Sequence, residues 1–238
     1  MDNLKWLSGK VDEVQLVLFE TPELSNIPTA SDVEEFKRIA EDAGLAFTVH
    51  LPGDIELASS DETQRRTSIE RFKRIVKLSQ PLSPICWVLH LSLPPEGEDP
   101  EVHIDRLRSS MNQLTGEFSS PRDLAVENIH KTFEVETVIV ELFDTSVCVD
   151  IGHLLLFNAD IWQHLDQWLP RCRNVHLHGT KDGRDHESLD CLPFGFAGDL
   201  FRRLSLEPGL ETVTMEVFGM EDFEKSVTAL CADDVKIY

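Results

Sequence analysis

Six short apolar segments of this chain each carry, near the carboxyl end, side chains that can bind a metal ion or transfer a proton. Each segment has the length and the β-branched, aromatic or leucine-rich composition of a strand, and amphipathic stretches separate the segments. The polar residues are His50, His90, Glu127, Asp150 with His153, His176 with His178, and Glu216. A closed parallel barrel gathers the carboxyl ends of its strands on one face. We therefore expect these distant residues to converge on one pocket.

The alternation of strand-like and helix-like segments predicts an α/β fold. Strands are expected at Val14–Phe19, Phe47–Leu51, Ile85–Leu91, Leu124–Ile129, Val147–Ile151, Asn174–Leu177 and Val213–Phe218. Nothing between Asp182 and Gly195 has a good strand pattern, so the seventh strand is expected to be weak or irregular. Parallel strands with helical crossovers and a length of 238 residues fit one (β/α)8 TIM barrel domain over residues 1–238. A doubly wound open sheet is the alternative.

Helices are expected at Ser60–Ser79, Asp160–Leu169, Phe196–Leu204 and Glu221–Leu230, and before Gly44. Ser31 and Glu34 have the spacing of a capping box that starts the helix ending at Gly44. The segment FEVETVIVELF is rich in β-branched residues but lies between two stronger strands, so we predict a helix there.

The charge and the cysteines limit the possible partners and compartment. A net charge of −21 with no evident basic groove opposes binding to nucleic acid or to anionic membranes. The five cysteines are widely spaced and contain no CxxC pair, which argues against a disulfide framework or a thiolate zinc site. The first residues, MDNLKWLSGKVDE, lack an apolar signal core, and no long hydrophobic span follows. We therefore expect a cytoplasmic protein.

Imidazole and carboxylate groups are the usual ligands of Zn²⁺, Mn²⁺ and Fe²⁺. A single histidine in an apolar segment is more often structural, but three acids and three imidazoles in equivalent places favour a metal site. Buried carboxylates without partners would also cost several kcal/mol. The predicted ligands are His50, His90, Glu127, Asp150, His153, His176, His186 and Glu216. The alternatives are a capping role for His153 and a solvated loop position for His186.

Other polar residues near these segments are assigned different roles. We expect His178, Lys181 and Asn128 to contact the substrate. His103, His130 and His164 lack apolar neighbours in the sequence and are predicted to lie on the surface.

The same polar residues resemble those of the xylose isomerase-like barrel superfamily, which includes endonuclease IV, sugar epimerases and inosose dehydratases. Glu127, Asp150, His176 and Glu216 match the single-metal site of the epimerases. His50 and His90 match the multi-metal phosphodiesterase branch typified by endonuclease IV. In that branch a further ion uses a histidine after strand five and an Asp-x-His pair after strand six. Here His153 and His186 are present, but Arg184 replaces the aspartate. Whether a third ion binds is therefore an open question at this stage.

Within that branch the chain is similar to the cobamide-remodelling phosphodiesterases of the CbiR type. The similar segments are HLPGD at 50–54, DIGHLL at 150–155 and HLHGTKDGRDHESLD at 176–190. The resemblance implies hydrolysis of the nucleotide loop of vitamin B12-like cobamides at the phosphoribosyl bond, giving a cobinamide phosphate and an α-riboside.

Two mechanisms are compatible with these residues. A phosphodiesterase would use two or three divalent ions, with zinc favoured over manganese or iron, and Glu127 and Glu216 as catalytic residues. A single-metal sugar isomerase or epimerase would use the same two glutamates as acid and base, but it gives His50 and His90 no metal-binding role. A non-catalytic corrinoid-binding barrel would require the polar residues to bind no metal. The acidic charge, with acidic or proline-rich loops, disfavours a DNA-repair enzyme.

Overall fold

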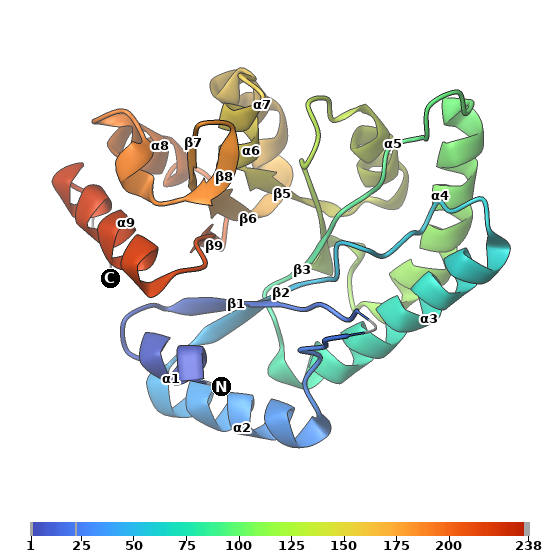
Figure 1. Cartoon of the computed structure of the whole chain (residues 1–238), viewed down its shortest axis with the longest axis horizontal. Coiled ribbons are helices and arrows are strands. Elements are labelled where there is room, and N and C mark those ends of the chain that lie inside the picture. The colour runs from blue at the N-terminus through green and yellow to red at the C-terminus, as the bar shows by residue number, and fades with distance from the viewer. Residues whose placement is uncertain (1, 22, 236–238) are drawn as a thin grey trace. The chain divides into compact units, whose positions relative to one another are not determined.

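The computed structural model describes residues 2–21 and 23–235 of the chain (Figure 1). The chain falls into two compact units. Unit 1 comprises Met1–Glu127 and Phe133–Ser146, and unit 2 comprises Asn128–Thr132 and Val147–Tyr238. A single domain over residues 1–238 stays a prediction.

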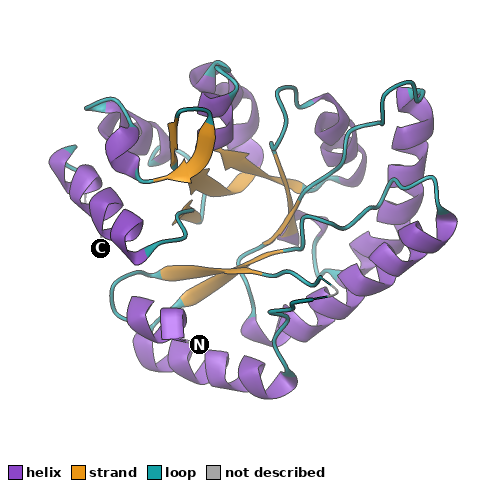
Figure 2. Cartoon of the chain, in the orientation of Figure 1, coloured by secondary structure: helices purple, strands orange, loops and turns teal. Residues whose placement is uncertain are grey.

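Unit 1 is built from parallel strands that follow one another in chain order, with helices between them (Figure 2). Its strands are β1 (Glu13–Val17), β2 (Ala46–His50), β3 (Trp87–Leu89) and β4 (Leu124–Glu127), each paired in parallel with the next. Its helices are α1 (Asp2–Leu7), α2 (Ala30–Ala43), α3 (Glu62–Ser79), α4 (Pro100–Leu114) and α5 (Glu134–Phe143). Short 3-10 turns η1 (Gln80–Leu82), η2 (Thr115–Glu117) and η3 (Pro121–Asp123) complete it. Helix α5 confirms the helical prediction for FEVETVIVELF.

The core of unit 1 explains why these segments adopt their structures. The three residues of β3 are buried, as expected for a parallel strand covered on both faces. Phe72, Ile75 and Val76 form an apolar stripe along α3 and are fully buried. At α2, the capping box is formed by Thr29 and Asp32, so the prediction of Ser31 and Glu34 was wrong by two residues. The helix ends at Gly44 in the left-handed conformation, as predicted.

The described part of unit 2 contains three parallel strands. They are β5 (Ser146–Asp150, whose first residue belongs to unit 1), β6 (Cys172–Leu177) and β9 (Thr212–Met215), with β6 paired to both others. Its helices are α6 (Ile151–Leu156), α7 (Ile161–Trp168), α8 (Phe196–Leu204) and α9 (Met220–Ala232), with 3-10 turns η4 (Leu169–Arg171) and η5 (Leu189–Cys191).

An antiparallel hairpin follows β6. It consists of β7 (Gly179–Lys181) and β8 (Arg184–Glu187), joined by Asp182 and Gly183 with φ angles of 53° and 74°. Two positive φ angles suit a two-residue hairpin turn, and Asp-Gly is its sequence signature. Among residues 178–211, all of which the structure describes, no strand joins the parallel set, which agrees with the predicted irregular seventh strand.

Several strands end earlier than predicted. The predicted strand Ile85–Leu91 is observed only at Trp87–Leu89, so His90 lies just beyond β3.

In the described part of the chain, no helix is both long and apolar enough to cross a membrane. All five cysteines are free thiols. The surface prediction was wrong for His103, which is buried and hydrogen-bonded to the carbonyl of Ser92.

Candidate functional site

Unit 1 brings together three of the predicted metal ligands. His50 ends β2, His90 follows β3, and Glu127 ends β4. The Nε2 atoms of His50 and His90 lie 3.2 Å and 3.0 Å from the same oxygen, Oε2 of Glu127. The two imidazole rings meet edge to face, with centroids 4.6 Å apart. We call these residues the His-His-Glu group.

The orientation of His50 fits a metal ligand. Its Nδ1 lies 2.8 Å from the carbonyl oxygen of Leu51, which can only accept, so Nδ1 carries a proton. In the neutral ring Nε2 then presents a lone pair toward the Glu127 carboxylate. Two electron-rich atoms at 3.2 Å repel each other unless a proton or a metal ion lies between them. A backbone carbonyl that fixes the second ring nitrogen is also the usual arrangement at metal-binding histidines.

Unit 2 holds a second group of donors, which we call the Asp-His-Glu group. Asp150 ends β5, His176 lies in β6, and Glu216 follows β9. Nδ1 of His176 lies 3.2 Å from Oε2 of Glu216 and 3.7 Å from Oδ2 of Asp150. All three residues are buried, and one donor atom of each lies within 4.8 Å of the others.

The Asp150 carboxylate is ionised. Burial by itself would raise its pKa, but the imidazoles of His176 and His178 outweigh burial and hold the pKa of Asp150 well below its usual range. Oδ1 also accepts the backbone N–H of His153 at 2.6 Å, which makes Asp150 the N-cap of α6. A buried, ionised carboxylate is a suitable ligand for a divalent cation.

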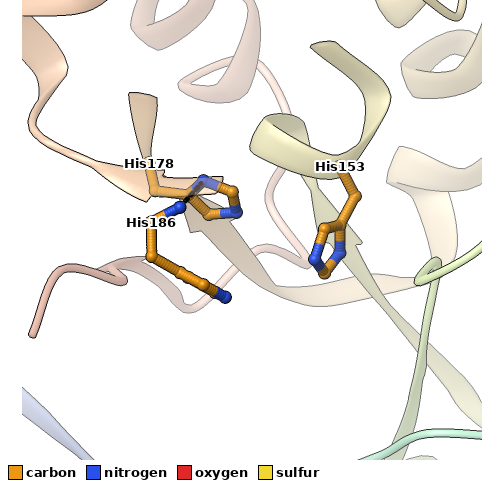
Figure 3. Close-up of side chains that lie close together, drawn as sticks. All are labelled: His153, His178 and His186. Atoms are coloured by element: carbon orange, nitrogen blue, oxygen red, sulfur yellow. Dashed lines mark hydrogen bonds between the residues drawn. The ribbon is translucent and has the colours of Figure 1, made fainter. Parts of the chain in front are cut away.

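Three histidines of unit 2 form a further group, the three-histidine group (Figure 3). His153 projects from α6, His178 follows β6, and His186 lies in β8. The ring of His178 is 5.4 Å from that of His153 and 4.4 Å from that of His186, measured between centroids. The three offer ligand atoms within 4.8 Å of one another.

Asp185 is a possible donor that the sequence analysis missed. Its Oδ2 lies 3.8 Å from Nε2 of His153 and 3.9 Å from Nε2 of His186. Nδ1 of His186 lies 3.2 Å from the carbonyl oxygen of Glu216, so the lone pair of the neutral ring is on Nε2. Arg184, which stands where the resembling family has an aspartate, instead forms an ion pair with Glu187. The Asp-Gly turn signal at 182–183 could have predicted the hairpin that positions Asp185.

His178 is oriented differently from the other histidines. Its Nδ1 lies 2.9 Å from the backbone nitrogen of His186, which donates to it, and 3.1 Å from the carbonyl oxygen of Gly179. Its Nε2 lies 3.2 Å from Oδ1 of Asp150. Burial would lower the pKa of His178, but Asp150 outweighs burial and raises it. Gly152 packs directly against this ring, and a Cβ atom at that position would overlap it.

The predicted substrate contacts have contrasting environments. Asn128 is buried, and its side-chain amide both accepts from the backbone N–H of Asp150 at 2.8 Å and donates to its carbonyl at 2.9 Å. Lys181 is exposed on β7. The sequence analysis also missed Phe218, which is 67% exposed while its ring lies 4.9 Å from that of His186. Substrate contact by Asn128, Lys181 and His178 stays a prediction.

The donor chemistry in both units fits borderline divalent metals. The His-His-Glu and Asp-His-Glu groups combine imidazole nitrogens with carboxylate oxygens, the three-histidine group offers imidazoles, and none of the three contains a thiolate. All eight predicted ligands belong to one of these groups. The convergence of the groups of units 1 and 2 on one pocket stays a prediction.

Comparison with known proteins gives the family and the fold. The model of the xylose isomerase-like TIM barrel family matches residues 10–229. A D-tagatose 3-epimerase-like protein has 17% identity and a TM-score of 0.73, with 95% of this chain and 91% of that chain covered. A 3-keto-D-glucoside 4-epimerase, YcjR, from E. coli has 13% identity and a TM-score of 0.68, with coverage of 87% and 86%. The IOLI protein with a binding zinc atom has 14% identity and a TM-score of 0.69, with coverage of 98% and 90%.

At identities this low, the similarity to solved structures establishes the fold alone. Together with the family match, it confirms the predicted barrel class. No curated protein matches the chain.

Proposed function

The chain belongs to the xylose isomerase-like TIM barrel family, and we propose that within this family it acts as a metal-dependent phosphodiesterase. The observation that supports this function is the His-His-Glu group of unit 1, which exists in addition to the Asp-His-Glu group of unit 2. Each group offers three donors, so the chain has ligands for at least two ions. Hydrolysis of phosphodiesters commonly uses two or more metal ions.

Divalent ions at these groups would neutralise phosphate charge and make a water molecule more acidic. The residues of the chain determine where the ions are held. Leu51 fixes the ring of His50 through its carbonyl, and Asn128 fixes the backbone of Asp150. The predicted catalytic residues are Glu127 and Glu216, each of which faces an imidazole through Oε2. His153, His186 and Asp185 are the candidate ligands of a third ion, and zinc remains our first choice of metal.

The proposed substrate is a cobamide with an intact nucleotide loop. Its support is the resemblance of residues 50–54, 150–155 and 176–190 to cobamide-remodelling phosphodiesterases. The net charge of −21 disfavours a nucleic-acid substrate. In the reaction, the hydroxyl of water is added to phosphorus, the bond from phosphorus to the ribose oxygen breaks, and the ribose oxygen takes the proton. We propose that this occurs in the cytoplasm, without a membrane or nucleic-acid partner.

A second candidate is a single-metal sugar isomerase or epimerase. The comparisons favour it, since the similar solved structures carry the names of sugar epimerases. Glu127 and Glu216 would then act as base and acid on the substrate carbon. This function needs no second ion at His50 and His90.

The two candidates differ in metal content and in substrate. We would saturate the metal-stripped protein with Zn²⁺ or Mn²⁺, count the bound ions, and incubate it separately with adenosylcobalamin, an abasic-site duplex and a ketohexose. Two or more ions per chain and release of an α-riboside, abolished by a chelator, are the expected results. One ion per chain with epimerised sugar would support the second candidate. Cleavage of the duplex alone would refute the cobamide substrate.

A further inference from the structure

We infer that His178 is a positioning residue, which holds the Asp150 carboxylate and the β7–β8 hairpin, and is neither a metal ligand nor a substrate contact. This inference rests on the proposed metal-binding function of Asp150. Its position within the three-histidine group makes His178 look like a third imidazole ligand (Figure 3). The hydrogen bonds of its two ring nitrogens indicate a different role.

The first nitrogen, Nδ1, has two backbone neighbours: the N–H of His186 and, at the longer distance of 3.1 Å, the carbonyl oxygen of Gly179. The backbone N–H of His186 points at Nδ1 over 2.9 Å, and a backbone amide always carries its hydrogen. The contact with the amide is the shorter of the two, and in that arrangement Nδ1 presents its lone pair to the N–H of His186. In a neutral imidazole the proton is then on Nε2. At His50 and His186 the Nδ1 atom faces a carbonyl oxygen at 2.8 Å and 3.2 Å, and Nε2 faces a carboxylate.

The second nitrogen, Nε2, faces the carboxylate. It lies 3.2 Å from Oδ1 of Asp150, the same oxygen that accepts the backbone N–H of His153. Two N–H groups are then directed at Oδ1. The other oxygen, Oδ2, faces Nδ1 of His153 at 3.4 Å and Nδ1 of His176 at 3.7 Å. A protonated Nε2 therefore orients the carboxylate so that Oδ2 can bind a metal ion. Such contacts from outside the ligand set commonly determine metal affinity.

The surroundings of the ring keep it in this position. A side chain at Gly152 would overlap the ring of His178, so the absence of a Cβ atom there allows the close approach. His186 has a φ angle of 53°, a left-handed conformation that is uncommon for residues other than glycine. The hydrogen bond from the backbone N–H of His186 to Nδ1 of His178 stabilises that conformation. The contact thus ties the hairpin to the Asp150 carboxylate.

Substitutions that keep one ring nitrogen at a time would test this role. The terminal amide of His178→Gln can replace Nε2–H, whereas the shorter His178→Asn reaches only the position of Nδ1. Arg184→Ala, on the exposed side of the same hairpin, is the matched control, and His178→Ala removes both nitrogens. Zn²⁺ binding to the metal-stripped full chain would be measured by competition with a chromophoric chelator, together with the number of ions bound at saturation.

The expected result separates affinity from stoichiometry. His178→Gln and Arg184→Ala should bind Zn²⁺ within about threefold of the wild type. His178→Asn and His178→Ala should lose roughly 10- to 100-fold in affinity for one ion, while the number bound at saturation is unchanged. If His178→Ala does not fold by near-ultraviolet circular dichroism, the comparison of the Gln and Asn variants decides the question.

Three results would overturn the inference. The loss of one ion per chain at saturating Zn²⁺ would make His178 a ligand. Unchanged affinity in the Asn variant, or an equal loss in the Gln and Asn variants, would leave Nε2 without a positioning role. If the wild-type protein binds no divalent ion, the proposed function itself fails and the inference fails with it.

Discussion

Glu136 should make the stability of this protein decrease as the pH rises. The residue lies on α5 and is 0% exposed, and neither of its carboxylate oxygens has a hydrogen-bond partner among the described residues. Burial raises the pKa of Glu136 from its ordinary value of 4.5 to about 7. The folded state therefore keeps this proton over a pH range in which the unfolded chain releases it.

The size of the effect follows from the two pKa values. Below pH 4.5 the carboxyl is protonated in both states and the shift costs nothing. Between pH 4.5 and about 7 the unfolded state binds fewer protons than the folded state, so the free energy of unfolding decreases as the pH rises. At about 1.4 kcal/mol for each pKa unit, the full cost above pH 7 is about 3 kcal/mol.

Glu136→Gln removes this cost, because the amide does not ionise. Relative to the wild type, the variant should gain about 1 kcal/mol near pH 5.5 and about 3 kcal/mol near pH 8, beyond any constant offset of the amide itself. Urea unfolding of the metal-stripped proteins at several pH values measures this difference. Glu141→Gln, an exposed position on the same helix, is the control and should differ from the wild type by less than about 0.5 kcal/mol at every pH. A Glu136→Gln difference that stays constant between pH 5.5 and 8 would refute the reasoning.

Three further predictions concern the metal-binding residues. Glu127→Gln should reduce the rate of hydrolysis by about 100-fold or more, because an amide replaces the carboxylate that faces two imidazoles. The variant should remain folded. Turnover measures the first effect and thermal unfolding the second. His50→Ala or His90→Ala should lower the zinc content by about one ion per chain in atomic absorption. Gly152→Ala should destabilise the fold by about 1–3 kcal/mol in urea and weaken Zn²⁺ binding, because its Cβ displaces the ring of His178.

Each of these predictions has a specific counter-result. Normal turnover with full metal content in Glu127→Gln would remove this residue from the mechanism. Unchanged zinc in both histidine variants would make those histidines structural and would favour the sugar epimerase. Gly53→Ala is the control for Gly152→Ala, since a Cβ at Gly53 would lie 3.4 Å from Nδ1 of His90, an ordinary contact. Equal effects of the two glycine substitutions would mean that the ring of His178 moves freely.

The sequence determined the order of strands and helices and the positions of the candidate ligands. Alternation, helical spacing and the terminating Gly44 reflect local backbone preferences, which a short segment contains within itself. The helix Phe196–Leu204 was predicted to the residue for this reason. The acid and imidazole positions were recognisable because a polar residue at the end of an apolar segment is costly unless it has a partner.

Only the tertiary structure decided how individual polar groups are used. The burial of Glu136 and of His103 depends on residues distant in the sequence, so no local pattern indicated it. The same holds for Asp185, which the hairpin brings within 3.8 Å of the imidazole of His153. The spacing of His176 and His178 made both candidates for the site. Their different roles follow from the neighbours of each ring nitrogen, because a hydrogen bond depends on distance and direction in space and not on position along the chain.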